Sequence, residues 1–313
     1  NKPREDYPQK FALTDWRPGQ MLYFCESTNI SIENVELNNA AYWTCFLHGC
    51  ENVQIDNVKI WNAFETPNGD GIDIDCCKNV TVSNCIIVSG DDSITFRGNP
   101  NGLKNPRPCE NVVVTNCILS TPCNAFRVGV GSGEIKNCTV SNCMIYNTRT
   151  GICIVSKYGL KSAGVQIENI NFSNIIMDVV RPIFLAANVR GSINEESKLI
   201  SGIFFNNLSG KATRSSLIEG NDDQRLERVT ISGYNFIYSG DGEDIEYGED
   251  LRYAEFSVKA APAAFHVRNV KDIEFDRVAI DWQTDSAKWL YGIWTQNCRE
   301  LYINRCRMKQ DYK

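Results

Sequence analysis

NISIENV from Asn29, NVQIDNV from Asn52 and NVTVSNC from Asn79 begin a series that continues with NVVVTNC from Asn111, NCTVSNC from Asn137 and NINFSNI from Asn169. Each copy alternates aliphatic and polar residues with a period of two, which is typical of a β-strand. The copies follow at steps of 23, 27, 32, 26 and 32 residues, and no helical pattern lies between them. Short parallel strands without helical crossovers predict a solenoid: an all-β, right-handed parallel β-helix.

Weaker copies extend the pattern towards the C-terminus, as VKDIEFDRV from Val270 and CRELYINRC from Cys298. We therefore expect residues 1–313 to form a single parallel β-helix domain. The stretch from about 181 to 264 repeats less clearly and is predicted to be a less regular insertion. Its acidic segment SGDGEDIEYGED, from Ser239 to Asp250, is interpreted as a solvated loop.

Composition limits the classes of partner. The 313 residues are 42% hydrophobic, and no run approaches the about 18 apolar residues that a transmembrane helix needs, so no membrane association is expected. The net charge of −6 argues against nucleic acid, whose phosphates attract basic surfaces. The chain starts at Asn1 without a signal-like segment and is interpreted as processed or trimmed.

The cysteines, fourteen in all, are interpreted as core residues rather than a disulfide framework or metal ligands, and their redox state stays open. Free cysteine packs as a small apolar side chain, and the paired spacing of a zinc site is absent. Two sets are expected to occupy repeated positions in successive coils, namely Cys85, Cys117 and Cys143, and Cys77, Cys109 and Cys138. Asparagines that recur at the turns are expected to bond from coil to coil.

Two acidic motifs stand one coil apart, NGDGIDID from Asn68 to Asp75 and SGDDSITFRG from Ser89 to Gly98. Aligning four coils places aliphatic or aromatic residues at the same two inward positions, so the intervening side chains are predicted to share an outward face. Stacked carboxylates repel one another and do not stabilise a solenoid, which indicates a functional cluster. That face gathers Asp70, Asp73, Asp75, Asp91, Asp92, Arg97, Arg127 and Lys157.

NGDGIDID followed by GDD resembles the polygalacturonase family of glycoside hydrolases, family 28, whose motifs are NTD, [GQ]DD, GHG and RIK. The stretch WRPGQMLYFCESTNISIENVELNNAAYWTCF from Trp16 is similar to the preceding coil of that family, and PAAFHVRNVKDIEFDRV from Pro262 to a late coil of bacterial members. The resemblance implies a right-handed parallel β-helix that hydrolyses pectic polymers with inversion. It also implies secretion or a periplasmic location, a polysaccharide or oligosaccharide substrate and no cofactor or metal.

Carried over residue by residue, the resemblance makes Asp91 the general acid and makes Asp70 and Asp92 the groups that activate water. An inverting hydrolase needs one protonated and one ionised carboxyl group, about 6.5–9.5 Å apart, with water between them. Clustering is expected to raise the pKa of at least one member.

The other two motifs depart from the family. The GHG position reads Cys123-Asn124-Ala125, and the RIK position reads Cys153-Ile154-Val155. In the family these basic residues help to bind a galacturonate carboxylate, so the substrate here is expected to differ or to be held by other groups. The predicted substrate-binding residues are Asp73, Arg97, Asn124, Arg127 and Lys157.

Two other functions fit the same pattern. The acidic cluster could hold Ca²⁺ in a polysaccharide lyase, with Arg127 or Lys157 as the base. A non-catalytic glycan-binding β-helix would bind without turnover. Hydrolysis is favoured because GDD falls one coil after NGD, which binding alone does not require. The linkage cleaved, endo or exo action and the oligomeric state stay open.

Overall fold

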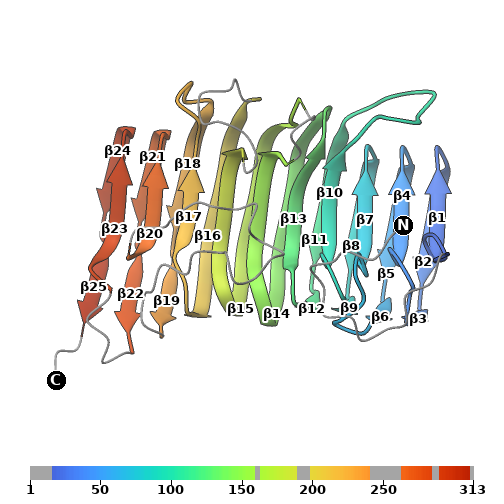
Figure 1. Cartoon of the computed structure of the whole chain (residues 1–313), viewed down its shortest axis with the longest axis horizontal. Helices are drawn as coiled ribbons and strands as arrows, with labels where there is room; N and C mark the ends of the chain where they lie inside the picture. Colours follow the sequence, from blue (N-terminus) through green and yellow to red (C-terminus); the bar gives the residue numbers. More distant parts are fainter. Residues whose placement is uncertain (1–15, 159–162, 189–197, 240–261, 284–288, 311–313) are drawn as a thin grey trace.

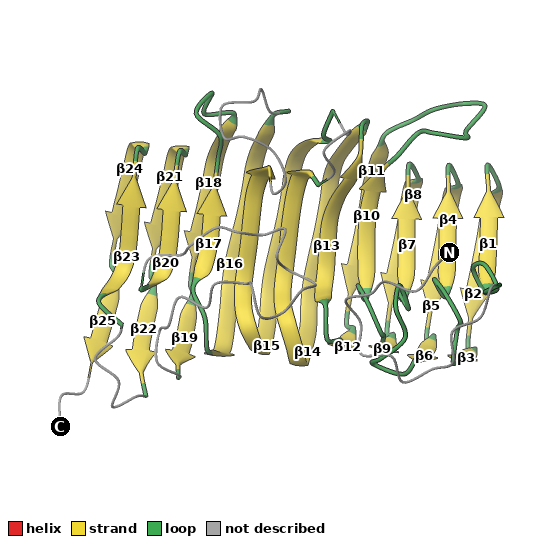
Figure 2. Cartoon of the chain, viewed as in Figure 1, coloured by secondary structure: helices red, strands yellow, loops and turns green. Residues whose placement is uncertain are grey.

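In the computed structural model of the chain, residues 16–158, 163–188, 198–239, 262–283 and 289–310 are described. All of their regular structure is β, arranged as parallel strands of one coiled sheet (Figures 1 and 2). Each coil pairs with the one before and the one after, so the chain forms the predicted right-handed parallel β-helix. Among the described residues, none forms a helix that could cross a bilayer.

Three faces run along the molecule, and each is built from every third strand. The first face carries the acidic motifs, the second carries the asparagine repeats, and the third closes each coil. Its strands are shorter than those of the other two faces in the first coils. The first face comprises β1 (Leu22–Cys25), β4 (Cys45–His48), β7 (Ile72–Asp75), β10 (Ile94–Gly98), β13 (Asn124–Gly131), β17 (Ser216–Glu219), β20 (Ala263–Arg268) and β23 (Tyr291–Gln296).

The second face comprises β2 (Thr28–Glu33), β5 (Glu51–Asp56), β8 (Lys78–Ser83), β11 (Cys109–Thr115), β18 (Leu226–Ser232), β21 (Lys271–Asp276) and β24 (Arg299–Asn304). The third comprises β3 (Glu36–Asn38), β6 (Lys59–Trp61), β9 (Ile86–Val88), β12 (Ile118–Ser120), β19 (Asn235–Tyr238), β22 (Ala279–Trp282) and β25 (Arg307–Gln310). Three long strands bend from face to face, β14 (Glu134–Lys157), β15 (Gln166–Asn188) and β16 (Ile200–Ala212).

The region predicted to be less regular, about 181–264, continues the coils in its described part. Strands β15 to β19 stack in register through Tyr238, and β17 pairs with β20 across the intervening segment. The coils continue because the aliphatic alternation persists there, as in the buried Ile203 and Phe205. The acidic segment after Ser239 lies outside the described residues.

The inward residues form one apolar core that follows the axis of the coils. All fourteen cysteines are free, and most are buried. Cys85, Cys117 and Cys143 share one position, as predicted. The second set was only partly right: Cys109 follows Cys77, but the next coil places Ile135 opposite Cys109, and Cys138 pairs with Val112.

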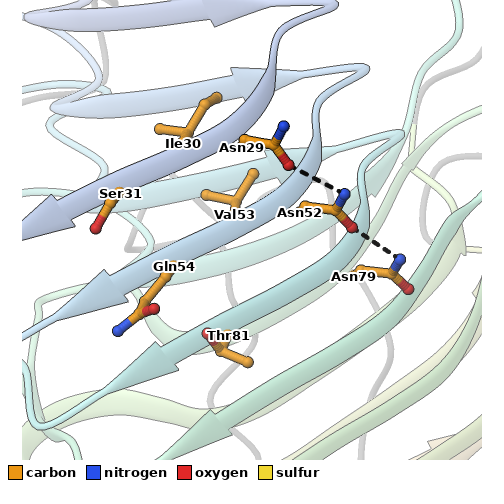
Figure 3. A pocket seen from close by; sticks show the side chains of 8 residues that line it. All are labelled: Asn29, Ile30, Ser31, Asn52, Val53, Gln54, Asn79 and Thr81. Carbon is orange, nitrogen blue, oxygen red and sulfur yellow. Dashed lines mark hydrogen bonds between the residues drawn. The ribbon is translucent and has the colours of Figure 1, made fainter.

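The turn asparagines form the predicted ladders on the second face (Figure 3). Asn52 Nδ2 donates to Asn29 Oδ1 at 3.3 Å, Asn79 Nδ2 to Asn52 Oδ1 at 3.1 Å, and Asn111 Nδ2 to Asn79 Oδ1 at 3.1 Å. Each of the four has a positive φ between 55° and 57°, a conformation that asparagine tolerates better than most residues. The repeated asparagine therefore adopts the positive φ that the bend requires and also pairs its side-chain amide with the next coil.

A shallow groove lies beside this ladder over β2, β5 and β8 (Figure 3). It is lined by Asn29, Ile30, Ser31, Asn52, Val53, Gln54, Asn79 and Thr81. None of these side chains titrates near neutral pH, so the groove offers no acid or base for hydrolysis. The ionisable cluster lies on the first face.

Candidate active site

The first face brings the two acidic motifs together as the sequence predicted. Strand β10 pairs with β7, so that Thr95 lies opposite Asp73 and Arg97 opposite Asp75. On its other side β10 pairs with β13, which places Arg127 opposite Thr95. The predicted inward positions hold in all four coils: Ile72, Ile94, Phe126 and Ile152, then Ile74, Phe96, Val128 and Ile154.

Asp91 and Asp92 form the turn before β10. Asp92 Oδ1 accepts hydrogen bonds from Asn124 Nδ2 at 2.6 Å and from the Asn124 backbone N–H at 3.3 Å. Asp91 Oδ1 accepts a bond from the Asp92 backbone N–H at 3.1 Å, and its side chain is buried. Burial and the neighbouring Asp91 raise the pKa of Asp92. Asn124, predicted to bind substrate, thus holds the Asp92 carboxylate.

Asp70 is almost fully buried one coil earlier, and its Oδ1 has no hydrogen-bond partner among the described residues. Burial raises the pKa of Asp70 well above its ordinary value, and the nearby Asp73, Asp91 and Asp92 raise it further. The expectation that clustering raises a carboxyl pKa is therefore met at both Asp70 and Asp92. A group of this kind can hold a proton under conditions in which an exposed aspartate is ionised.

Asp73 and Asp75 are held by cross-coil partners. Thr95 Oγ1 donates to Asp73 Oδ1 at 2.6 Å, and Arg97 lies between the two carboxylates, with Nε 3.3 Å from Asp75 Oδ2 and Nη1 3.7 Å from Asp73 Oδ1. Burial raises the pKa of Asp73 to about 7, although Arg97 and Thr95 act in the opposite direction. The Asp73 side chain is fully buried and contacts Thr95 and Arg97, and its role in substrate binding stays a prediction.

Arg127 places a buried positive charge beside the carboxyl groups, and this charge works against the rise in the pKa of Asp92. Its Nη1 lies 3.3 Å from the Val128 carbonyl oxygen and 3.5 Å from Cys153 Sγ, and its guanidinium lies 5.2 Å from the centre of the Tyr158 ring. Its Nη2 is buried and has no hydrogen-bond partner among the described residues.

Lys157 is placed differently. It pairs with Asn188 at the end of β14, four residues beyond Cys153, which corresponds to about 13 Å along an extended strand. The structure therefore does not gather it with the carboxyl groups, and its role in substrate binding stays a prediction.

Sequence reasoning missed Arg149. Its Nη2 lies 3.3 Å from Cys123 Sγ and 3.4 Å from Asn124 Oδ1, so it brings a second guanidinium to the position of the missing GHG histidine. The signal was available, since Arg149 precedes Thr150 and Thr150 pairs with Asn124.

Among the described residues, one set of donor atoms is close enough to hold a metal ion: those of Asp91, Asp92 and Cys123, within 4.8 Å of one another. Ca²⁺ prefers oxygen ligands only, and the Cys123 thiol is a soft donor. Arg149 also already supplies positive charge to Cys123. This donor set is a poor match to the calcium centre of the lyase alternative.

The model of Glycosyl hydrolases family 28 matches residues 15–249, which include all the carboxyl groups described above. The chain belongs to this family. An exopolygalacturonase of Arabidopsis thaliana is 29% identical over 209 residues, covering 64% of this chain and 46% of the relative. An endo-polygalacturonase of Pectobacterium carotovorum is 23% identical over 219 residues, covering 68% of this chain and 51% of the relative.

The family 28 exopolygalacturonase of Yersinia enterocolitica has a similar fold, with a TM-score of 0.63 and 17% identity. The superposition covers 88% of this chain and 45% of that structure. The family 28 chain thus spans about half of the length of the relatives it matches.

Proposed function

We propose that this chain hydrolyses a glycosidic bond in a galacturonate-containing pectic glycan, with inversion. Asp91 protonates the leaving glycosidic oxygen as the sugar C–O bond breaks. Asp70 and Asp92 hold the water whose oxygen joins the anomeric carbon, and they take up its proton. The observation that carries the proposal is the register that stacks the Asp70 coil on the Asp91–Asp92 coil within a family 28 chain.

The electrostatics support a carboxyl cluster that shares protons. Burial and the neighbouring carboxyl groups raise the pKa values of Asp70 and Asp92, so the cluster can hold a proton under conditions in which an exposed aspartate is ionised. Ionisation of these groups is favoured by the positive charges of Arg97 and Arg127, which act on Asp70 and Asp92 respectively. A cluster that carries both a proton and a negative charge is what acid–base hydrolysis requires.

Positive charge also supports an acidic substrate. Arg127 places a buried positive charge near Asp92, and Arg149 stands at the position of the missing histidine. A guanidinium binds a carboxylate through paired, charge-assisted hydrogen bonds. We propose that these arginines take over the galacturonate binding that the absent GHG and RIK side chains provide in the family. Secretion is the location that fits such a substrate and stays a prediction.

The spacing of the carboxyl groups makes the configuration of the released sugar a test of the proposed inversion. Donor oxygens of Asp91 and Asp92 lie within 4.8 Å, which is shorter than the about 6.5–9.5 Å typical of an inverting pair. Inversion therefore requires that Asp70 share the binding of water with Asp92. Determining the anomer first released, by NMR during hydrolysis, tests this point, and a retained configuration would refute it.

The main experiment measures reducing-end release from polygalacturonan, rhamnogalacturonan and neutral pectic side chains. We expect wild-type release from a galacturonate-containing polymer, insensitive to EDTA, and at least about a 100-fold loss in Asp91→Asn. Asp56→Asn is the matched control: it makes the same carboxyl-to-amide change on β5, where Asp56 bonds to Ser83 and Asn84. Equal activity of Asp91→Asn and Asp56→Asn would overturn the assignment.

A further inference from the structure

Aromatic side chains continue the first face beyond the carboxyl groups. Tyr23 on β1 lies opposite Phe46 on β4, and Phe46 lies opposite Asp73 on β7. The Tyr23 and Phe46 rings stack with centroids 5.2 Å apart and an interplanar angle of 6°. Trp43 meets Phe46 edge-on, with centroids 4.9 Å apart. We call Tyr23, Trp43 and Phe46 the aromatic platform; β4, which carries Phe46, lies beside β7, and β1, which carries Tyr23, lies beyond β4 (Figure 1).

The platform is joined to the carboxyl cluster. Trp43 precedes Cys45 by two residues, as Asp70 precedes Ile72, and Cys45 pairs with Ile72. The backbone N–H of the next residue, Thr44, donates to the Asp70 carbonyl oxygen at 2.9 Å. The Arg97 guanidinium lies 4.6 Å from the centre of the Trp43 ring while it pairs with Asp73 and Asp75. Trp43 and the carboxyl groups thus share one side of two neighbouring coils.

The core does not require these rings. The inward positions of the same two strands are filled by Leu22, Phe24, Cys45 and Leu47, which belong to or pack against the main apolar core. Tyr23 instead remains 53% exposed, at the outer end of the stack. An exposed ring held rigidly by stacking on a second ring offers a flat apolar surface with little conformational freedom to lose on binding.

A sugar ring is a fitting occupant of such a surface. One face of a pyranose carries C–H groups that stack on an aromatic ring, while the hydroxyl groups bond to water or to polar neighbours. A pyranose unit is about as long as the rise of one coil, about 4.8 Å. A glycan lying along the first face would therefore place successive units over successive coils, with the Tyr23 coil two steps from the Asp73 coil.

We infer that the aromatic platform is a binding subsite for a sugar ring of the glycan, next to the bond-cleaving groups. The identification of the occupant as a glycan rests on the proposed function. The subsite binds by ring stacking and takes no part in proton transfer. It therefore contributes only to substrates long enough to reach Tyr23.

The test compares Tyr23→Ala with wild type on oligogalacturonides of increasing length. For the longest oligosaccharides, we expect about a tenfold rise in KM, with kcat retained. For the shortest oligosaccharide that is cleaved, we expect no change. Tyr23→Phe should behave as wild type because it keeps the ring. Tyr23→Leu, which still covers Phe46 but has no ring, should behave as Tyr23→Ala and guards against a folding defect.

Trp61→Ala is the matched control, because Trp61 is a 38% exposed aromatic residue on the third face, where β6 pairs with β3 and β9. If wild type is active and Tyr23→Ala matches Trp61→Ala, or weakens short and long substrates equally, the inference is wrong and the proposed function stands. If wild type releases no product, the proposed function fails. Titration of tryptophan fluorescence with the longest oligogalacturonide then decides the subsite: equal affinity of wild type and Tyr23→Ala, or no binding, overturns it.

Discussion

Two faces of the same coils carry opposite kinds of repetition. On the second face, Asn52, Asn79 and Asn111 repeat one residue in one conformation, and each amide bonds to the next. On the first face, the position of Asp70 is taken one coil later by Asp92 and then by Asn124. On the second face, repetition of the same residue satisfies the hydrogen-bonding groups of each amide. On the first face, repetition brings carboxyl groups together and raises the pKa values of Asp70 and Asp92.

The difference between the two faces follows from the hydrogen-bonding groups that each side chain offers. An amide has both a donor and an acceptor, so a stack of identical amides is self-complementary. A carboxylate has acceptors only, so a stack of carboxylates needs protons, arginines or a hydroxyl donor between its members. Thr95, Arg97 and Asn124 supply part of this need, and Asp70 Oδ1 has no hydrogen-bond partner among the described residues.

The largest expected effect comes from removing one charge on the first face. Asp92→Asn keeps an amide oxygen that accepts the bond from Asn124 Nδ2, but it cannot ionise. We expect kcat on the substrate identified by reducing-end release to fall by about 10²–10⁴-fold. The melting temperature should be unchanged or higher, since a costly buried charge is removed. If the variant melts at a lower temperature and keeps its kcat, Asp92 has a structural role, like the asparagines of the second face, and not a catalytic one.

The second face should give the reverse result. Asn79→Ala loses both ladder hydrogen bonds and places alanine at a φ of 57°, so we expect the free energy of unfolding to fall by about 1–3 kcal/mol. Its kcat should stay at the wild-type value. Asn79→Gly, which adopts this φ freely, should lose less stability. Denaturant unfolding of the three proteins measures the order, and equal stability of Asn79→Ala and wild type would contradict the structural role of the ladder.

The repeat predicted the fold because alternation sets both strand and register. Aligning Ile72, Ile94, Phe126 and Ile152 was sufficient to stack the acidic motifs, as the structure confirms. The alignment works because a shift by one residue would turn every apolar side chain out of the core. The Cys85, Cys117 and Cys143 ladder was predictable for the same reason.

Side-chain contacts between loops and coils could not be predicted from the repeat. The misplacement of Cys138 is a different case, because the repeat itself places it opposite Val112: each directly follows the first asparagine of its copy. Arg149 reaches Cys123 from the next coil, and Arg97 turns towards Trp43. Long side chains of this kind choose partners by local geometry that periodicity does not encode. For that reason the aromatic platform appeared only in three dimensions, whereas the alignment of Thr150 with Asn124 had already placed Arg149 next to the site.

The last expected effect is a pH dependence of stability that distinguishes buried from exposed carboxyl groups. Burial raises the pKa of Asp73 to about 7 from an ordinary value of 3.8. The folded state thus binds this proton more tightly than the unfolded chain does. Its contribution to stability is complete below about pH 4 and is lost as the pH rises to about 7. We expect Asp73→Asn, which cannot ionise, to show a flatter fall in melting temperature between pH 4 and 7 than wild type.

Asp276 provides the control with the opposite sign. Hydrogen bonds from Arg305 lower the pKa of Asp276, so its contribution is present above its unfolded-state pKa, about 4, and is lost only as the pH falls through its folded-state pKa. Asp276→Asn should therefore follow the wild-type slope between pH 4 and 7 and differ from it at lower pH. Parallel curves for Asp73→Asn and wild type across that window would mean that Arg97 and Thr95 keep Asp73 ionised in the folded state. The raised carboxyl pKa values of the first face would then be confined to Asp70 and Asp92. Only these two groups would distinguish the first face from the asparagine ladder of the second.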